Sequence, residues 1–132
     1  MTDLLSDEPS ALDAAIGLVA VELLDNAVVL RLDPPAAALG GEEPRPFLHG
    51  GTLATCVDTA AWYAACSAGG GDWVVSSLAV DFLRPVALEE LRVIARCRRA
   101  GRTLAVVDVE IAQRDDSDRV LAIGRASLMR LG

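Results

Sequence analysis

The sequence predicts an α+β fold, in which an antiparallel sheet of about six strands curls around one long buried helix. Residues 52–68 are apolar nearly all round, which is typical of a helix covered on every side. Four segments after this stretch and two before it have the composition and alternation of β-strands. Because one sheet has to cover such a helix, we expect the sheet to curl around it.

The N-terminal region predicts a short helix over residues 7–16. Ser6 or Asp7 stands near its start, and Gly17 is a residue type that commonly ends a helix.

A hairpin and a loop follow this helix. The β-rich segments 18–24 and 27–32 are joined by Asp25-Asn26, which predicts a tight turn. Residues 33–48 contain four of the six prolines and two glycines, so they predict a loop with at most one helical turn.

The central apolar helix carries one charge. It begins after Gly50-Gly51 and ends at the glycines 69–71. Twelve of its seventeen residues are apolar, and Asp58 is the only charged one. A charged group on a buried helix is costly without partners, and perturbed acids gather at functional sites. Asp58 is therefore a candidate catalytic residue. The alternative is a buried acid that only accepts backbone hydrogen bonds.

Four further strands are predicted at residues 73–83, 88–99, 104–113 and 120–131. The second and third alternate most clearly between apolar and polar side chains. Residues 100–101 and 115–118 supply turns between them. In the first of these strands, the alternation places Val75 and Ser77 on one face and Ser76 on the other.

The composition argues against several classes of function. The net charge of −7 disfavours a nucleic-acid partner, because phosphate binding depends on clustered positive charge. No apolar run approaches the roughly 18 uncharged residues of a membrane span, and the acidic N-terminus lacks the pattern of a secretory signal. We expect a cytoplasmic protein with one domain over residues 1–132, in which residues 1–16 form an N-terminal helical segment.

The cysteines do not indicate a metal site. Cys56, Cys66 and Cys97 form no CxxC pair, and the chain has one His. We therefore expect no zinc and no cofactor. The three thiols are interpreted as small buried hydrophobic groups in a reducing compartment.

Two motifs resemble those of a known family. Residues 49–60 read HGGTLATCVDTA, and residues 80–85 read VDFLRP. Together, and in these predicted elements, they are similar to the signatures of PaaI-like acyl-CoA thioesterases, which have the hotdog fold. The resemblance covers roughly residues 15–131.

The resemblance implies roles for Gly50 and Asp58. The Gly50 N–H would polarise the thioester carbonyl, and Asp58 would act as nucleophile or general base. Their eight-residue separation on one helix is about 12 Å, too far to act on one carbonyl within a single subunit. In the family, the helix start of one subunit faces the acid of the other. We therefore expect a homodimer, paired again into a homotetramer.

Five further residues are candidates for substrate binding. The resemblance favours a role for His49 in fixing the loop before the helix, although it could also be a base. The others are Gly51, Trp62, Ser77 and Arg84. Trp62 would line the acyl pocket or belong to the core, Ser77 could support the catalytic acid, and Arg84 could meet a coenzyme A phosphate or form a surface ion pair.

The predicted function is hydrolysis of a small or aromatic acyl-CoA. The sequence departs from the family at three helper positions, which hold Glu43, Trp62 and Val75. A non-catalytic acyl-CoA-binding protein therefore remains an alternative, as does a carrier-protein thioester as substrate. A hotdog dehydratase is less consistent with the sequence, because His49 has no acid at the spacing that those enzymes use.

Overall fold

The secondary structure lies close to its predicted positions. The computed structural model describes residues 4–6, 8–40 and 47–132. Its helices and strands are α1 (Ala11–Ile16), β1 (Leu18–Leu24), β2 (Ala27–Leu32), α2 (Gly50–Gly69), β3 (Trp73–Phe82), β4 (Leu91–Ala100), β5 (Leu104–Gln113) and β6 (Asp116–Arg130), with 3₁₀ turns at Leu4–Ser6 and Ala36–Ala38.

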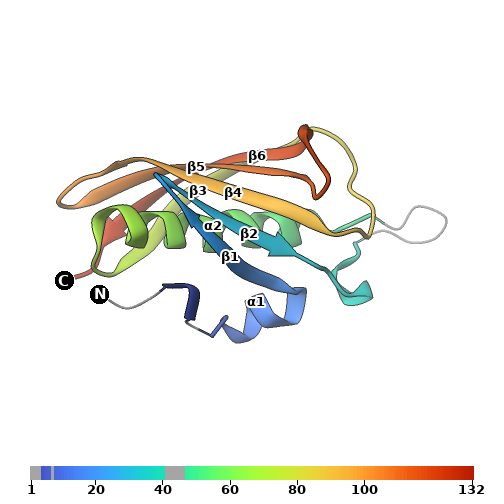
Figure 1. Cartoon of the computed structure of the whole chain (residues 1–132), viewed down its shortest axis with the longest axis horizontal. Helices are drawn as coiled ribbons and strands as arrows, with labels where there is room; N and C mark the ends of the chain where they lie inside the picture. The colour runs from blue at the N-terminus through green and yellow to red at the C-terminus, as the bar shows by residue number, and fades with distance from the viewer. Residues whose placement is uncertain (1–3, 7, 41–46) are drawn as a thin grey trace.

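The strands form one antiparallel sheet in the order β1-β2-β4-β5-β6-β3. α2 lies against one face of this sheet, where it contacts all strands from β2 to β6 (Figure 1). α1 packs against β1 and α2. The predicted α+β fold, with a sheet curled around one long helix, is confirmed. Over the described residues, no helix combines the length and apolar character that crossing a bilayer requires.

The core lies between α2 and the inner face of the sheet. Alternate residues of β5 point inward, as predicted, and are buried: Ala105, Val107, Val109 and Ile111. On the helix, Cys56 and Ala60 are fully buried. A Cβ at Gly124 of β6 would come within 2.9 Å of the methyl groups of Val57, so this glycine allows the sheet to approach α2 closely.

The N-terminal helix is shorter than predicted. It begins at Ala11 because Ser10 is its N-cap: the Ser10 side chain accepts a hydrogen bond from the Asp13 N–H. It ends at Gly17, which has a left-handed φ of 81°, and a Cβ at this position would lie 2.0 Å from the Asp33 carbonyl oxygen. Asp7, a predicted start of this helix, lies outside the described residues.

A β-bulge in β3 overturns one prediction about the sheet. The pairing with β6 shifts register between Val75 and Ser77, which leaves Ser76 as an extra residue. The Ser76 hydroxyl donates to the Ser127 carbonyl at 3.1 Å. Past the bulge the alternation is reversed, so that Leu78 borders a hollow along α2. Ser77 therefore does not share the face of Val75. The prediction was wrong because the period-two pattern assumes an unbroken ladder.

The turn between β5 and β6 is also shorter than predicted. It consists of Arg114 and Asp115, and β6 begins at Asp116, which pairs with Gln113. Residues 116–119 are polar and exposed. They continue the hairpin past the edge of the core, where strand pairing does not require apolar side chains.

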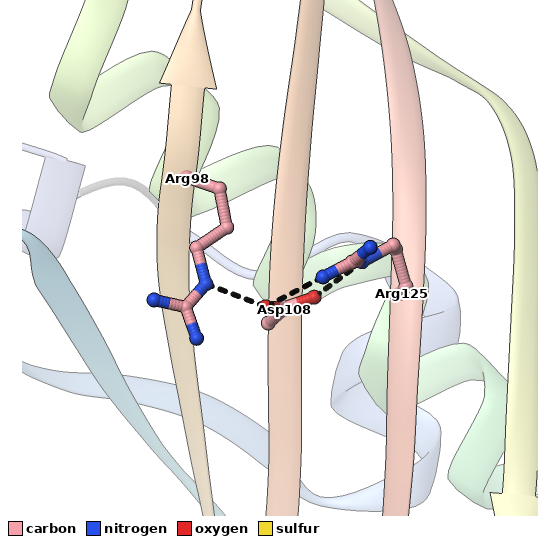
Figure 2. A network of polar contacts seen from close by, with 3 residues as sticks. All are labelled: Arg98, Asp108 and Arg125. Carbon is pink, nitrogen blue, oxygen red and sulfur yellow. Dashed lines mark hydrogen bonds and ion pairs between the residues drawn. The ribbon is translucent and has the colours of Figure 1, made fainter.

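The outer face of the sheet carries a network of three charges. Asp108 of β5 lies between Arg98 of β4 and Arg125 of β6 (Figure 2). Its carboxylate accepts from the Arg98 Nε at 2.5 Å and from the Arg125 Nε and Nη2 at 2.6 and 3.1 Å. Hydrogen bonds from Arg125, and then from Arg98, lower the pKa of Asp108 from 3.8 to about 2. A carboxylate that bridges three strands in this way contributes to the stability of the sheet.

We expect Asp108→Asn to lower the free energy of unfolding by about 1 kcal/mol at neutral pH, because solvent screens this exposed cluster. The folded pKa of Asp108 lies below its unfolded value, so the contribution is present above pH 3.8 and is lost as the pH falls towards 2. Urea denaturation of the two proteins should therefore converge at low pH. Asp115→Asn is the control, because its 3.7 Å contact with Arg114 is highly exposed. A difference that persists at pH 2 would contradict this role for Asp108.

Candidate active site

The start of α2 is organised by His49. This residue is the N-cap, and its Nδ1 accepts a hydrogen bond from the Gly51 N–H at 2.8 Å. A Cβ at Gly51 would lie 2.9 Å from that nitrogen, so the glycine makes room for the cap. His49 therefore fixes the beginning of the helix, and the Gly51 amide is occupied by it.

The Gly50 amide is open. In the described part of the chain no acceptor meets the Gly50 N–H, whereas the Gly51 and Thr52 amides both bond to His49. The ring of Phe82 lies over Gly50, where a Cβ would meet its Cζ at 3.2 Å. An unpaired N–H at the positive end of a helix, beside an apolar ring, is suited to a developing negative charge.

Asp58 lies on the exposed side of α2. With Gly51, Ala54 and Thr55 it borders a hollow that Leu78 of β3 closes on the other side. The side chain is exposed in the single chain, yet the atoms around it partly desolvate the carboxylate. This desolvation raises the pKa of Asp58, and the negative charge of Asp13 raises it further. A carboxylate with raised pKa is a stronger base than a free one.

A cavity of about 630 Å³ opens next to Asp58. Its walls combine aromatic side chains with a few polar groups: Glu8, Ser10, Asp13, Asp58, Thr59, Trp62, Tyr63, Trp73, Val74 and Val75. Trp62 is half-buried and meets Tyr63 edge to face, with ring centroids 5.1 Å apart. Trp62 thus lies in the cavity wall and also packs against the core.

The structure brings some of the predicted site residues together and separates others. Asp58 and Trp62 share the cavity, and Gly50 lies at the N-terminal end of the same helix. Ser77 is absent from both hollows beside Asp58, because the bulge turns it to the other face. Arg84 is exposed beyond the end of β3. Glu43 lies outside the described residues.

Sequence reasoning missed the contribution of the N-terminal segment. Asp13 of α1 reaches the cavity and accepts a hydrogen bond from the Thr59 hydroxyl at 2.7 Å. The one available signal was the spacing of Ser10 and Asp13, which is typical of a helix start. That signal predicts where α1 begins in the sequence, but it does not predict that α1 packs against α2.

Cys56, two residues before Asp58 on α2, does not compete with it as a nucleophile. Cys56 is fully buried, and this burial, followed by the charge of Asp13, raises its pKa to about 12. The thiol is therefore protonated and unreactive at neutral pH. Within the described residues, no group of three or more potential ligands could hold a metal ion.

Comparisons with known proteins agree on one family. The sequence matches the family model of the Thioesterase superfamily over residues 46–121. A conserved protein from Pseudomonas aeruginosa is 30% identical with a TM-score of 0.82, covering 93% of this chain and 95% of that one. The PaaI protein of the Escherichia coli phenylacetic acid degradation operon is 30% identical, with a TM-score of 0.80 and coverage of 93% and 86%. A thioesterase family protein from Silicibacter pomeroyi is also 30% identical, with a TM-score of 0.80 and coverage of 92% and 90%. No curated protein matches the chain.

We expect His49→Ala to lower the free energy of unfolding by about 1 kcal/mol, the usual cost of losing a helix N-cap. His49→Asn is the matched variant, because an Asn side chain can accept the same hydrogen bond and should retain most of the stability. Chemical denaturation measures both. If His49→Asn lowers the free energy of unfolding as much as His49→Ala does, the contribution of His49 comes from its packing against Gly40 and not from the hydrogen bond. The two residues are so close that a Cβ added at Gly40 would lie 2.7 Å from the imidazole ring.

Proposed function

This chain belongs to the thioesterase superfamily, among its PaaI-like members with the hotdog fold, and on this premise we propose that it hydrolyses an acyl-CoA thioester. The observation that carries the proposal is the position of Asp58. Its carboxylate lines a cavity that also contains aromatic side chains, on the helix whose first amide meets no acceptor among the described residues. A basic carboxylate and an open amide donor are the groups that thioester hydrolysis needs.

In the proposed reaction, Asp58 takes a proton from a water molecule as the water oxygen attacks the thioester carbonyl carbon. The Gly50 N–H stabilises the oxyanion. The C–S bond then breaks, the proton on Asp58 passes to the leaving thiolate, and a carboxylic acid and a free thiol depart. In the alternative route, Asp58 itself attacks the carbonyl carbon, the C–S bond breaks, and the thiolate leaves and takes a proton from solvent. Water then hydrolyses the resulting mixed anhydride, which releases the carboxylic acid and restores Asp58. Neither route needs a cofactor.

The working unit that we propose is a homodimer joined along β3. This strand is an edge of the sheet, and Val74, Leu78 and Phe82 are exposed along it by 44, 37 and 52%. An edge strand with exposed apolar side chains is a ready surface for pairing with another chain. A two-fold axis would make the pairing self-complementary and antiparallel, and two such dimers would form the expected homotetramer.

The same pairing would complete the site. Antiparallel pairing would bring the Phe82 end of one β3 next to the Val74 end of the other. Phe82 covers Gly50, and Val74 borders the cavity beside Asp58. The open amide of one α2 would thereby approach the carboxylate of the second α2, which resolves their separation of about 12 Å within one subunit.

The cavity favours a small or aromatic acyl group. Trp62, Tyr63 and Trp73 contribute much of its wall, and flat rings stack well on aromatic side chains. The similar PaaI protein belongs to a phenylacetic acid degradation operon, which agrees with an aromatic acyl chain. Arg84 is the cation we propose for a coenzyme A phosphate, because it is exposed at the same end of β3 as Phe82.

We expect Asp58→Asn to lower kcat/KM by about 10²–10⁴-fold, the usual contribution of a general base. The variant should fold at least as well as wild type, because an unfavourable charge is removed. Release of free thiol from a panel of acyl-CoAs measures the rate, with Asp81→Asn on the outer face of β3 as the control. A folded Asp58→Asn protein with near wild-type turnover would overturn the mechanism. Acyl-CoA binding without hydrolysis by wild type would favour the non-catalytic binding protein.

Gly50→Pro tests the oxyanion donor. Proline is tolerated at the first position of a helix, and His49 already has the extended φ and ψ of −61° and 135° that a residue before proline needs. Gly50→Ala is the matched control, since it adds a Cβ against Phe82 but keeps the N–H. We expect the proline variant to lose about 10²–10³-fold more in kcat/KM than the alanine variant. If kcat/KM falls equally in the two variants, the effect comes from crowding against Phe82 and not from loss of the Gly50 N–H.

Mixed dimers extend this test to the subunit arrangement. If each site combines Gly50 of one subunit with Asp58 of the other, a dimer of one Gly50→Pro and one Asp58→Asn subunit has one intact site. Random co-assembly in equal amounts should then restore about a quarter of wild-type activity. Absence of recovery in confirmed mixed dimers would show that the site lies within one subunit.

A further inference from the structure

Asp13 is a buried carboxylate close to the proposed site. The residue is 8% exposed. Oδ1 accepts a hydrogen bond from the Thr59 hydroxyl at 2.7 Å, and Oδ2 accepts one from the Ser10 hydroxyl at 2.9 Å. The Ser10 hydroxyl oxygen also accepts the Asp13 N–H at 3.1 Å. These bonds fix both oxygens and tie α1 to α2 at the residue next to Asp58.

Two neutral hydroxyls are an unusual environment for a buried acid. Among the described residues, no cation forms an ion pair with Asp13. A buried carboxylate without a cation costs free energy, whereas an Asn could accept the same Thr59 hydrogen bond at a smaller cost. The negative charge is therefore not needed to dock α1, which points to a use for the charge itself.

Asp13 and Asp58 line the same two hollows. Both border the cavity of about 630 Å³ and the smaller hollow of about 370 Å³ on the other side of Thr59. Like charges that share a poorly solvated site each favour protonation of the other.

We propose that Asp13 is a positioning residue whose fixed negative charge makes Asp58 a stronger base. This inference deepens the proposed thioesterase function and rests on it. Asp13 acts on the Asp58 carboxylate and makes no contact with the reacting atoms. A stronger base takes the proton of the attacking water more readily, as long as it remains ionised at the working pH.

The electrostatic surroundings of Asp58 support this assignment. The pKa of Asp58 is raised by desolvation first and by Asp13 second. The other ionisable groups nearby are the exposed Glu8 on the N-terminal segment, and Cys56 and Tyr63 on α2. Cys56 is a neutral thiol with a pKa of about 12. β3 presents only uncharged residues to the two hollows: Trp73, Val74, Val75 and Leu78. In the proposed dimer, the positive end of the second α2 would act equally on all variants compared below.

Asp13→Asn removes the charge and keeps an acceptor for Thr59. We expect the acidic limb of the pH profile of kcat/KM to move to lower pH. At neutral pH the rate should fall by roughly threefold to tenfold, a fraction of what a general base supplies in total. Asp118→Asn on β6 is the matched control, because it makes the same change at an exposed acid that borders neither hollow and should leave the profile unchanged. A purely structural role for Asp13 would change thermal stability or KM but would not move the acidic limb.

Carbon-13 carboxyl NMR provides a readout that does not depend on activity. The Asp58 resonance should titrate at lower pH in Asp13→Asn than in wild type. In wild type alone, the chemical shift of the Asp13 carboxyl carbon should show an inflection where Asp58 titrates, and this remains measurable if the variant does not fold. An Asp58 titration that is the same in both proteins, or a wild-type Asp13 resonance without that inflection, would overturn the proposal. If wild type releases no thiol while the Asp13 resonance responds to the titration of Asp58, the proposed function fails and the interaction between the two residues stands.

Discussion

α2 can be stable only if the rest of the molecule covers almost its whole circumference, because its side chains are apolar on nearly every side. The sheet covers one side and has to curl to do so, while α1 covers part of another. Alanine and cysteine on α2 and Gly124 on β6 permit the close packing that this covering needs. Apart from the exposed last residues of α2, the chain leaves uncovered a strip from Gly51 through Asp58 to the half-buried Trp62, bordered by β3.

The proposed chemistry follows from that uncovered strip. The helix start supplies an open amide and the middle of the helix supplies a carboxylate, but the rigid helix holds them about 12 Å apart. A second copy placed along β3 would cover the exposed apolar residues of the edge strand and bring an amide to each carboxylate. Burial and catalysis would then be served by the same contact, which agrees with an edge strand of ten residues whose single charged side chain is Asp81.

The fold could be predicted from the sequence because its main signals are local. The apolar helix, the Asp25-Asn26 turn and the alternation of β5 each appear within a short window of residues. The bulge at Ser76 could not be predicted in this way, because it depends on how two strands pair. The role of Asp13 was missed for a similar reason: only the docking of α1 on α2 shows that Ser10 and Thr59 hold its carboxylate. Asp58 could be predicted because a single charged residue in an apolar helix is recognisable from the sequence alone.

The N-terminal segment, on our proposal, belongs to the site as much as to the fold. In the proposed dimer, Asp58 would experience two opposing influences. The positive end of a neighbouring helix favours its charged form and would weaken it as a base, whereas desolvation and the charge of Asp13 oppose this effect. A substrate that fills the cavity removes more water from both acids and strengthens their interaction. The fixed charge on α1 would therefore act most strongly when an acyl group is bound, which is when a base is needed.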